Sequence, residues 1–447
     1  MAVALALAGS MVWSLCAPYR DAGVEAVRKK GYPASLSELD AWYPAVPPSD
    51  NAALVYTNAF ALLAGSGVSS NAERLLNASL PSRGQRLTLT AEDKRDLAEL
   101  LAANEAALRL LYSAPASGRS RYPIDLREGF TLSLSHLGQV KQAVRLLGAE
   151  ALLRASEGDA EKATQALLAA GRVADSLSEE PLLISCLVRI ASWSTVVARL
   201  EQVLGLAQLT EEQLALLQRR VGEAERASAL VHALAGEQAS GIAIFTDRDM
   251  QDKVLGGPQG PNPPTRHVSY RAGLVFGLYR ATGLCQKDEA CYLGAMAKTL
   301  AAAELPYPAR FSASEQAGVI LTNPPPRFCI FSRMLLPALA RVYARDADFT
   351  ARIRAATTAL AVERFRRAHG NALPDTLEAL VPAYLPAVPS DPFDGKPLRF
   401  SRYGARHGHS YAVYSVGSDR KDDGGVDWTS SNPKPRNPRD IVFMAEH

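Results

Sequence analysis

The chain has few aromatic residues and little net charge. The low net charge argues against a nucleic-acid-binding protein and against a disordered acidic tail. Aromatic residues make up 7% of its 447 residues, and 49 basic against 46 acidic side chains leave a formal net charge of +3. No run of Lys or Arg is longer than three residues. A long basic tract for nucleic acid and a disordered acidic tail are both missing, so we predict no nucleic-acid partner.

Cysteine is also scarce. The five cysteines are Cys16, Cys186, Cys285, Cys291 and Cys329, and none forms a C-x-x-C pair, so a structural zinc site is not expected. Cys285 and Cys291 flank the short polar stretch QKDEA. The sequence leaves two interpretations of this pair open: a disulfide in an oxidising compartment, or two unpaired thiols.

Motifs of the common catalytic sites are missing as well. The chain has no G-x-S-x-G, no phosphate-binding P-loop, no dinucleotide-binding G-x-G-x-x-G and no H-E-x-x-H. The sequence therefore identifies no catalytic residue and no small-molecule substrate, and it favours a protein that is not an enzyme. One alternative is an enzyme with a cleft between its helical region and its C-terminal domain. Such a cleft would draw on Asp247, Arg266, His267 and Arg271.

The N-terminal segment is apolar. Residues 1–17 read MAVALALAGSMVWSLCA, and no charge occurs before Arg20. Seventeen residues is the lower limit for a helix that spans a bilayer. A secretory signal normally starts with a basic region, which this segment lacks. We predict a membrane anchor that holds an extracytoplasmic protein in the cell envelope. A signal segment and a buried helix of a soluble protein are the alternatives.

Alanine and leucine dominate the first 350 residues, a composition that favours helices. We predict an α-helical domain over residues 18–346. One helix is expected over residues 87–112 with Thr90 as its N-cap, and another is expected to begin with a capping box of Thr210 and Gln213.

One segment of this helical region, residues 146–177, resembles a single helical hairpin of the tetratricopeptide type. Gly158 and Asp159 would lie at its turn, and Ala163 at a tight packing contact. One such unit does not make a solenoid, which needs about three.

Near the C-terminus the apolar pattern changes from a helical period to alternation. A helix is expected over residues 349–369, with Asp348 as its N-cap and Gly370 as its stop. Alternating residues over 398–402 and 411–416 then predict a pair of strands. The predicted fold is therefore mostly α, a helical array followed by a small α+β domain over residues 347–447, which we call the C-terminal head.

The end of the head is rich in acid. Residues 417–440, the acid loop, contain Asp419, Asp422, Asp423, Asp427 and Asp440. Carboxylates at this density repel one another, and calcium removes that repulsion because it accepts six to eight oxygen ligands in loose geometry. The spacing is not that of an EF-hand. The alternative is a solvated acidic turn whose charge is balanced by neighbouring Arg and Lys residues.

A set of short motifs follows one another along the last hundred residues. In chain order they are His369-Gly370, Leu373-Pro374, Leu377 to Leu380, Pro389, Asp391-Pro392-Phe393, Gly395-Lys396-Pro397, Phe400, Tyr414-Ser415-Val416-Gly417, Asp419, Gly424-Gly425 and Asp440-Ile441. This series resembles the globular head of the major pseudopilins of type II secretion systems. The acid loop departs from the family pattern in two ways: Arg420 replaces the glycine expected after Asp419, and the stretch between Gly425 and Asp440 is longer and rich in proline.

The resemblance implies a calcium site in the acid loop. By position, Asp419 and Asp440 would be its main ligands, Val416 would offer a backbone carbonyl, and Asp422 or Asp423 would supplement them. No catalytic activity follows from the resemblance, which leaves the first 346 residues unassigned.

We therefore expect an envelope-anchored structural or interaction protein with protein partners and a calcium-stabilised, pseudopilin-like head. The alternative among binding proteins is a subunit of a type II secretion or pilus-like assembly.

Overall fold

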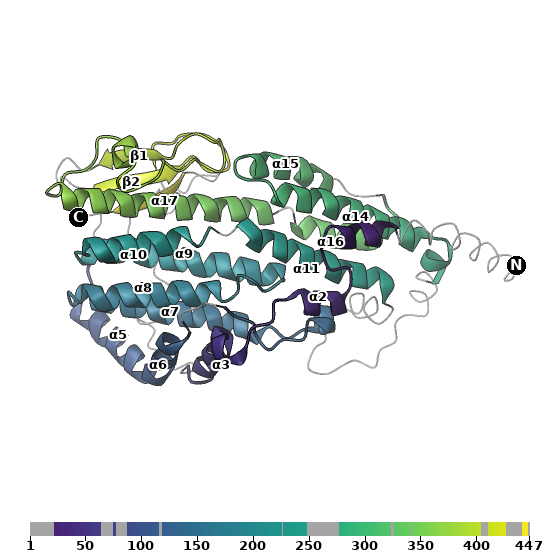
Figure 1. The fold of residues 1–447 in the computed structure, drawn as a ribbon, viewed down its shortest axis with the longest axis horizontal. Helices are drawn as coiled ribbons and strands as arrows, with labels where there is room; N and C mark the ends of the chain where they lie inside the picture. Colours follow the sequence, from purple (N-terminus) through teal and green to yellow (C-terminus); the bar gives the residue numbers. More distant parts are fainter. Residues whose placement is uncertain are drawn as a thin grey trace, which may run out of the picture.

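The computed structural model describes residues 22–63, 75–76, 87–115, 119–225, 227–247, 277–322, 326–339, 341–403, 410–425 and 440–445. Helices fill the described chain up to residue 368, and a small antiparallel sheet follows them (Figure 1). The predicted mostly helical fold with a small C-terminal sheet is confirmed. The finer resemblance of that end to a pseudopilin stays a prediction.

The elements run in the following order. They are α2 (Leu36–Trp42), η1 (Pro48–Asp50), α3 (Ala52–Ala61), α5 (Ala91–Ala103), α6 (Glu105–Ser113), η2 (Leu126–Thr131), α7 (Ser135–Ser156), α8 (Ala160–Asp175), α9 (Leu183–Leu206), α10 (Glu211–Gly222), α11 (Ala227–Thr246), α14 (Leu284–Ala303), α15 (Ala309–Thr322), α16 (Ile330–Leu339), α17 (Val342–Ala368), η3 (Leu377–Leu380), β1 (Arg399–Tyr403), β2 (Ser410–Ser415) and β3 (Ile441–Ala445).

The helical hairpin predicted over residues 146–177 is formed by α7 and α8, which pack along their length. Gly158 turns the chain with φ +84°, a left-handed conformation that glycine adopts without strain. Asp159 then caps α8 by accepting the Lys162 N–H at 3.0 Å. Ala163 is fully buried, as expected for a close helix contact.

Both predicted helix starts with a threonine cap are confirmed. Thr90 forms a capping box with Asp93, and Thr210 forms one with Gln213. The single helix predicted over residues 87–112 is wrong, because α5 ends and α6 begins at Asn104. The Asn104 side-chain amide donates to the Leu100 carbonyl at 2.9 Å, and this local bond satisfies the end of α5.

Helix α17 begins earlier than predicted. It starts at Val342, so Asp348 lies inside the helix and the predicted N-cap is wrong. The sequence before Asp348 holds no residue that breaks a helix, and tertiary packing extends it. The predicted stop is confirmed, since Gly370 follows the helix with φ +62°.

The sheet has the strand order β1-β2-β3, and both pairings are antiparallel. The predicted strand pair is β1 and β2. The third strand was not predicted, because its short apolar run Ile441-Val442-Phe443 has no alternation to identify it. At the centre of the sheet Val413 pairs with Phe400 on one side and Phe443 on the other.

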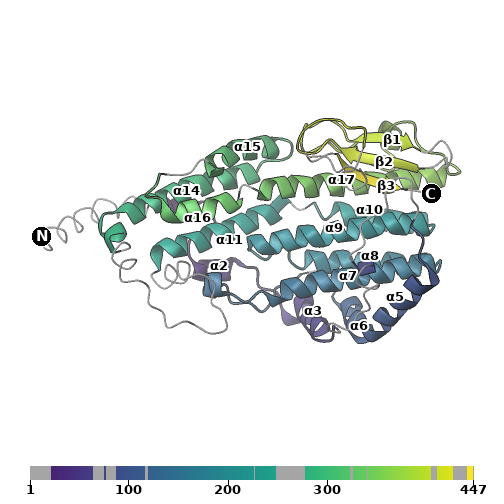
Figure 2. The same cartoon turned by 180° about the vertical axis from the view of Figure 1, so that it is seen from behind.

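The head and the helical array share a core. One cluster of buried apolar residues extends from Ala52 on α3 to Ala445 on β3. Helix α17 lies between the sheet and the pair α9 and α10, and it contacts β2 and β3 on one side and both helices on the other (Figure 2). The predicted boundary at residue 347 falls inside α17, so packing is continuous across it.

Helix α9 is, within the described residues, the one long and apolar enough to cross a membrane. It is internal, and it contacts α7, α8, α11 and α17. Arg189 and Arg199 on this helix are both buried, which a lipid-facing helix would not permit. Residues 1–17, which carry the anchor prediction, lie outside the described part of the chain.

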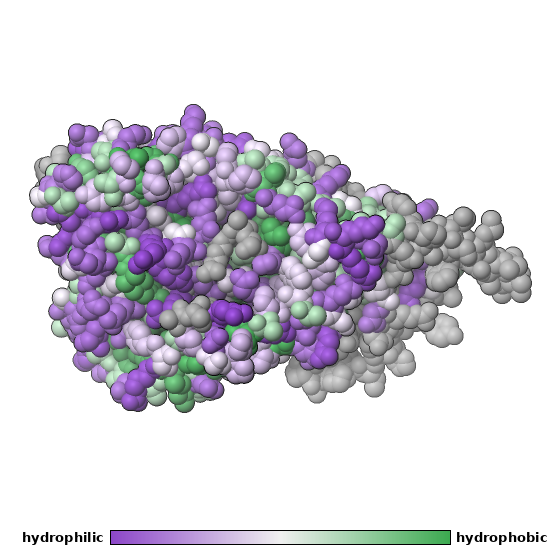
Figure 3. Space-filling view, in the orientation of Figure 1, coloured by the Kyte–Doolittle hydropathy of each residue, from purple (hydrophilic) through white to green (hydrophobic). Residues whose placement is uncertain are grey.

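Polar residues predominate on the face of the molecule in Figure 3, and apolar residues form small separate patches on it.

Candidate functional site

The acid loop leaves the sheet at the end of β2 and returns to it at the start of β3. Its described parts are residues 417–425 and Asp440. Asp419 is half-buried, Asp422 and Asp423 are exposed, and Asp440 is 3% exposed. Asp427 lies outside the described residues.

Asp440 is held by the backbone of its own loop. One carboxylate oxygen accepts the Gly425 N–H at 2.7 Å, and the other accepts the Asp423 N–H at 3.4 Å. Burial raises the pKa of Asp440 to about 6, the backbone hydrogen bonds oppose this, and the negative charges of Asp422 and Asp423 add to the rise. Three carboxylates therefore interact at one place, and the ionised form of the buried one is disfavoured.

The other two described aspartates also bind local groups. Asp422 Oδ1 accepts the Tyr414 hydroxyl at 3.1 Å and the Gly424 N–H at 2.9 Å. Asp419 Oδ1 accepts the Lys421 N–H at 3.1 Å. These contacts are turn-closing hydrogen bonds, so they fix the loop without neutralising its charge.

Arg420 explains one departure from the pseudopilin pattern. It has φ +56°, the left-handed conformation for which a glycine is expected. Its side chain leaves the loop: Nε donates to the Phe393 carbonyl at 3.1 Å, and Nη2 pairs with Glu315 at 2.7 Å. The guanidinium also lies over the Phe311 ring, 5.1 Å from its centroid. Arg420 therefore ties the acid loop to α15.

Within the described residues, no three His, Cys, Asp or Glu side chains are arranged to hold a metal ion. Side chains alone therefore do not form a metal site there. Asp440, Asp422 and Asp423 lie close enough for the charges of Asp422 and Asp423 to raise the pKa of Asp440. Asp419 does not join this group by any hydrogen bond described above, since its carboxylate accepts the Lys421 N–H. The Val416 N–H binds Asp391 at 2.9 Å, and the Val416 carbonyl is the ligand atom that the resemblance implies. The calcium site stays a prediction.

Asp391 is a residue of this region that was not predicted as part of the site. It is fully buried, and its carboxylate accepts four hydrogen bonds. The donors are Phe393 N at 2.9 Å, Ser415 Oγ at 3.0 Å, Val416 N at 2.9 Å and Arg399 Nη1 at 2.8 Å. Asp391 thereby joins the Asp-Pro-Phe turn to the end of β2, where the acid loop starts. The Asp-Pro-Phe match was its signal in the sequence.

Arg399 completes this cluster, and we call Asp391 with its four donors the Asp391 clamp. Arg399 pairs with Asp391 and also with Asp394. Burial alone would raise the pKa of Asp394, but the hydrogen bonds from Arg399 and the Lys396 N–H lower it. The clamp holds opposite charges in contact, unlike the acid loop beside it.

A serine, a histidine and a glutamate meet in the helical array, but in an order that does not suit catalysis. His136 Nε2 lies 3.1 Å from both oxygens of Glu180, and Ser185 Oγ donates to Glu180. The carboxylate lies between the other two groups, so the imidazole cannot take the serine proton. All three side chains are buried, and we interpret them as a structural network.

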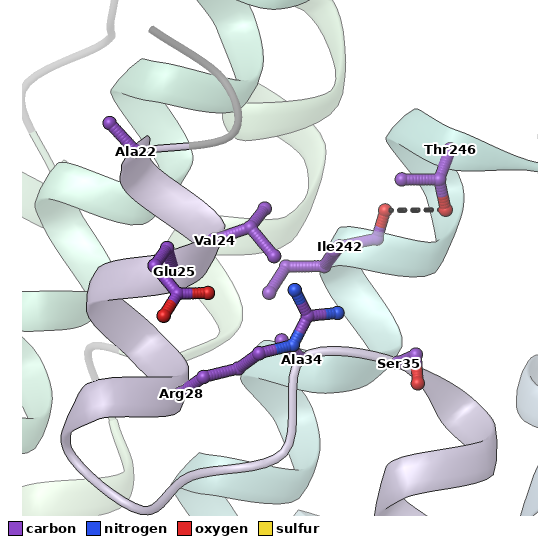
Figure 4. Close-up of a pocket in the computed structure, with 8 residues that line it drawn as sticks. All are labelled: Ala22, Val24, Glu25, Arg28, Ala34, Ser35, Ile242 and Thr246. Atoms are coloured by element: carbon purple, nitrogen blue, oxygen red, sulfur yellow. Dashed lines mark hydrogen bonds between the residues drawn. The ribbon is translucent and has the colours of Figure 1, made fainter. Parts of the chain in front are cut away.

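A hollow of about 730 Å³ lies between residues 22–35 and α11 (Figure 4). In the close-up Val24 and Ile242 approach each other across it, and Arg28 reaches into it. The Arg28 guanidinium is paired with Glu38 at 2.9 Å. Among the described residues, none of the head lines this hollow. For the predicted interdomain cleft, Asp247 is exposed at the end of α11, whereas Arg266, His267 and Arg271 lie outside the described residues.

Of the two interpretations left open for Cys285 and Cys291, the structure supports two cysteines that are not joined by a disulfide. Both residues belong to the continuous helix α14, and neither is in a disulfide. Six helical residues rise about 9 Å along the axis, and a disulfide requires Cα atoms within about 7 Å.

Comparisons with protein-family models, curated proteins and solved structures found no match to this chain.

Proposed function

We propose that the chain is an envelope-anchored structural or interaction protein whose C-terminal head is stabilised by calcium. Asp440 is the observation that carries the calcium part. It is a buried carboxylate with two backbone donors and two neighbouring carboxylates, and no basic side chain donates to it among the described contacts. A bound dication would compensate all three charges at once.

The backbone of the acid loop supports the same proposal. Gly417, Arg420, Gly424 and Gly425 all have positive φ. Successive left-handed turns bend a chain tightly enough to direct carbonyl oxygens toward one point, which is how calcium loops supply backbone ligands. The Asp391 clamp fixes Val416, whose carbonyl is one predicted ligand, at the start of this bend.

The anchor and the envelope location rest on the sequence of residues 1–17. The helical array then supplies the mass and the surface of an interaction protein, and its buried network of His136, Glu180 and Ser185 is not ordered for catalysis. These features favour protein partners over a substrate.

A subunit of a type II secretion or pilus-like assembly is the second candidate. Its support is the resemblance of the head. Against it, α17, the helix with which the head begins, is covered within its own chain, because it contacts α9, α10, β2 and β3. An assembly role would therefore use other surfaces of the head.

Thermal unfolding of the full chain in calcium, in magnesium and in a chelator tests the calcium site. The full chain is required because the head shares its core with the array. Calcium should raise the melting temperature, and saturation at 100 times the dissociation constant corresponds to about 2.7 kcal/mol. Magnesium should act weakly because it demands stricter geometry and loses its waters reluctantly.

Two variants make this test specific. Asp440→Asn should abolish the calcium-dependent rise. Asp375→Asn is the matched control, since Asp375 is an exposed carboxylate of the head that pairs with Arg402 away from the acid loop. An equal melting temperature in calcium and in chelator would contradict the site, as would equal loss of the rise in both variants.

A further inference from the structure

Asp288 joins α14 to the first turn of α16. It is fully buried, and its carboxylate accepts the Phe331 N–H at 2.8 Å, the Ser332 N–H at 3.1 Å, the Ser332 hydroxyl and the Tyr279 hydroxyl. Phe331 and Ser332 lie in the first turn of α16, where backbone N–H groups have no helical partner. The buried carboxylate therefore fixes the position of this helix start against α14.

This arrangement brings two cysteines together. Cys291 is three residues after Asp288 and so lies on the same face of α14. Cys329 lies two residues before Phe331. Because the Phe331 N–H binds Asp288, both cysteines lie beside the same contact between α14 and α16. Cys329 is fully buried and Cys291 is half-buried, so an incoming reagent reaches Cys291 first.

We propose that Cys291 and Cys329 form a disulfide that joins α14 to the start of α16. The oxidant is a small or protein disulfide, such as oxidised glutathione or a thiol oxidoreductase. The Cys291 thiolate attacks one of its sulfurs and releases a thiol. The Cys329 sulfur then displaces the second thiol from the mixed disulfide. Two protons and two electrons leave the protein, and the oxidant becomes two thiols.

The surroundings of Cys329 favour a durable bond. Burial raises the pKa of the Cys329 thiol to about 12, and the neighbouring Cys291 adds to this rise. A thiol of high pKa is a poor leaving group, so reduction of the disulfide would be slow. The bond would also close the loop that contains α15, which restricts the unfolded chain. The inference rests on one part of the proposed function, the envelope location, because that compartment is oxidising.

Peptide mapping of the full chain tests this proposal. The folded, purified protein is treated with oxidised glutathione, quenched with acid, unfolded and alkylated, with and without prior reduction. We expect a linked peptide pair containing Cys291 and Cys329, which reductant separates. Cys329→Ser should abolish the pair and leave Cys291 as a mixed disulfide with glutathione, which prior reduction opens to alkylation.

Cys285→Ser is the matched control, because Cys285 is buried on the same helix, and this variant should keep the linked pair. Full alkylation of Cys291 and Cys329 without reductant would overturn the proposal, as would a linked pair that contains Cys285. Neither result bears on the acid loop. Conversely, a failed calcium titration leaves the disulfide intact, so the two proposals fail separately.

Discussion

The clamp at Asp391 and the acid loop at Asp440 are neighbouring parts of the head, and each buries an aspartate. Asp391 is bound by an arginine, a hydroxyl and two backbone N–H groups. Asp440 is bound by two backbone N–H groups and faces two further carboxylates. The first region is electrostatically complete, whereas the second gains from a proton or a cation. Burial of a charge thus supports structure in one loop and points to a ligand in the other.

Asp391→Ala should have the largest effect. It leaves Arg399 with one carboxylate instead of two and removes the acceptor for Ser415 and Val416. Breaking a buried ion pair costs about 3–5 kcal/mol of unfolding free energy, which urea unfolding monitored by circular dichroism would measure. Asp394→Ala, which removes the more exposed partner of the same arginine, should cost less. Equal losses would mean that the burial of Asp391 is not what distinguishes the clamp.

Glu201→Ala should have an intermediate effect on the attachment of the sheet. Glu201 on α9 accepts the Met444 N–H of the edge strand β3 at 2.9 Å. Leaving that buried donor unpaired costs about 1–3 kcal/mol, again measurable by urea unfolding. Glu201→Gln retains an acceptor oxygen, so it should restore most of the loss. If the two variants were equally destabilised, the hydrogen bond would not be the cause.

The pH dependence of Asp440 should be the smallest effect. Its raised pKa, about 6, means that the folded chain binds this proton more tightly than the unfolded chain. The resulting stabilisation is present below the ordinary aspartate pKa and is lost as the pH rises through 6. Asp440→Asn should therefore gain stability relative to the wild type between pH 4 and 7 in chelator.

Calcium should cancel or reverse this trend by stabilising the ionised wild type. The readout is the difference in melting temperature between the two proteins across the pH range. A difference that does not change with pH would show that Asp440 is no harder to ionise when folded, and the contrast with Asp391 would then be lost.

Local signals in the sequence predicted several elements well. Thr90 and Thr210 identified helix starts, because a capping side chain binds its own backbone within three residues. Gly158 and Gly370 identified helix ends, because their positive φ is a local property. The alternation around Val413 identified β2 for a similar reason.

Contacts between distant residues were not predictable. Asp391 was matched as part of a motif, but its four donors come from segments up to 25 residues away, whose approach depends on the fold. The break at Asn104 follows from one side-chain hydrogen bond, and the extension of α17 to Val342 follows from packing. The pairing of Cys291 with Cys329 depends on Asp288 holding two helices together, which no spacing rule contains.

Neighbouring residues set the helical character of the chain, its caps, its strand pair and the concentration of acid near its C-terminus, so these features could be predicted from the sequence. The packing of α17 against both the array and the head, the pairing of Asp391 but not Asp440 with an arginine, and the approach of Cys291 to Cys329 follow from the folded structure. These outcomes depend on burial and on charges brought together from distant positions, and both are defined only once the chain has folded.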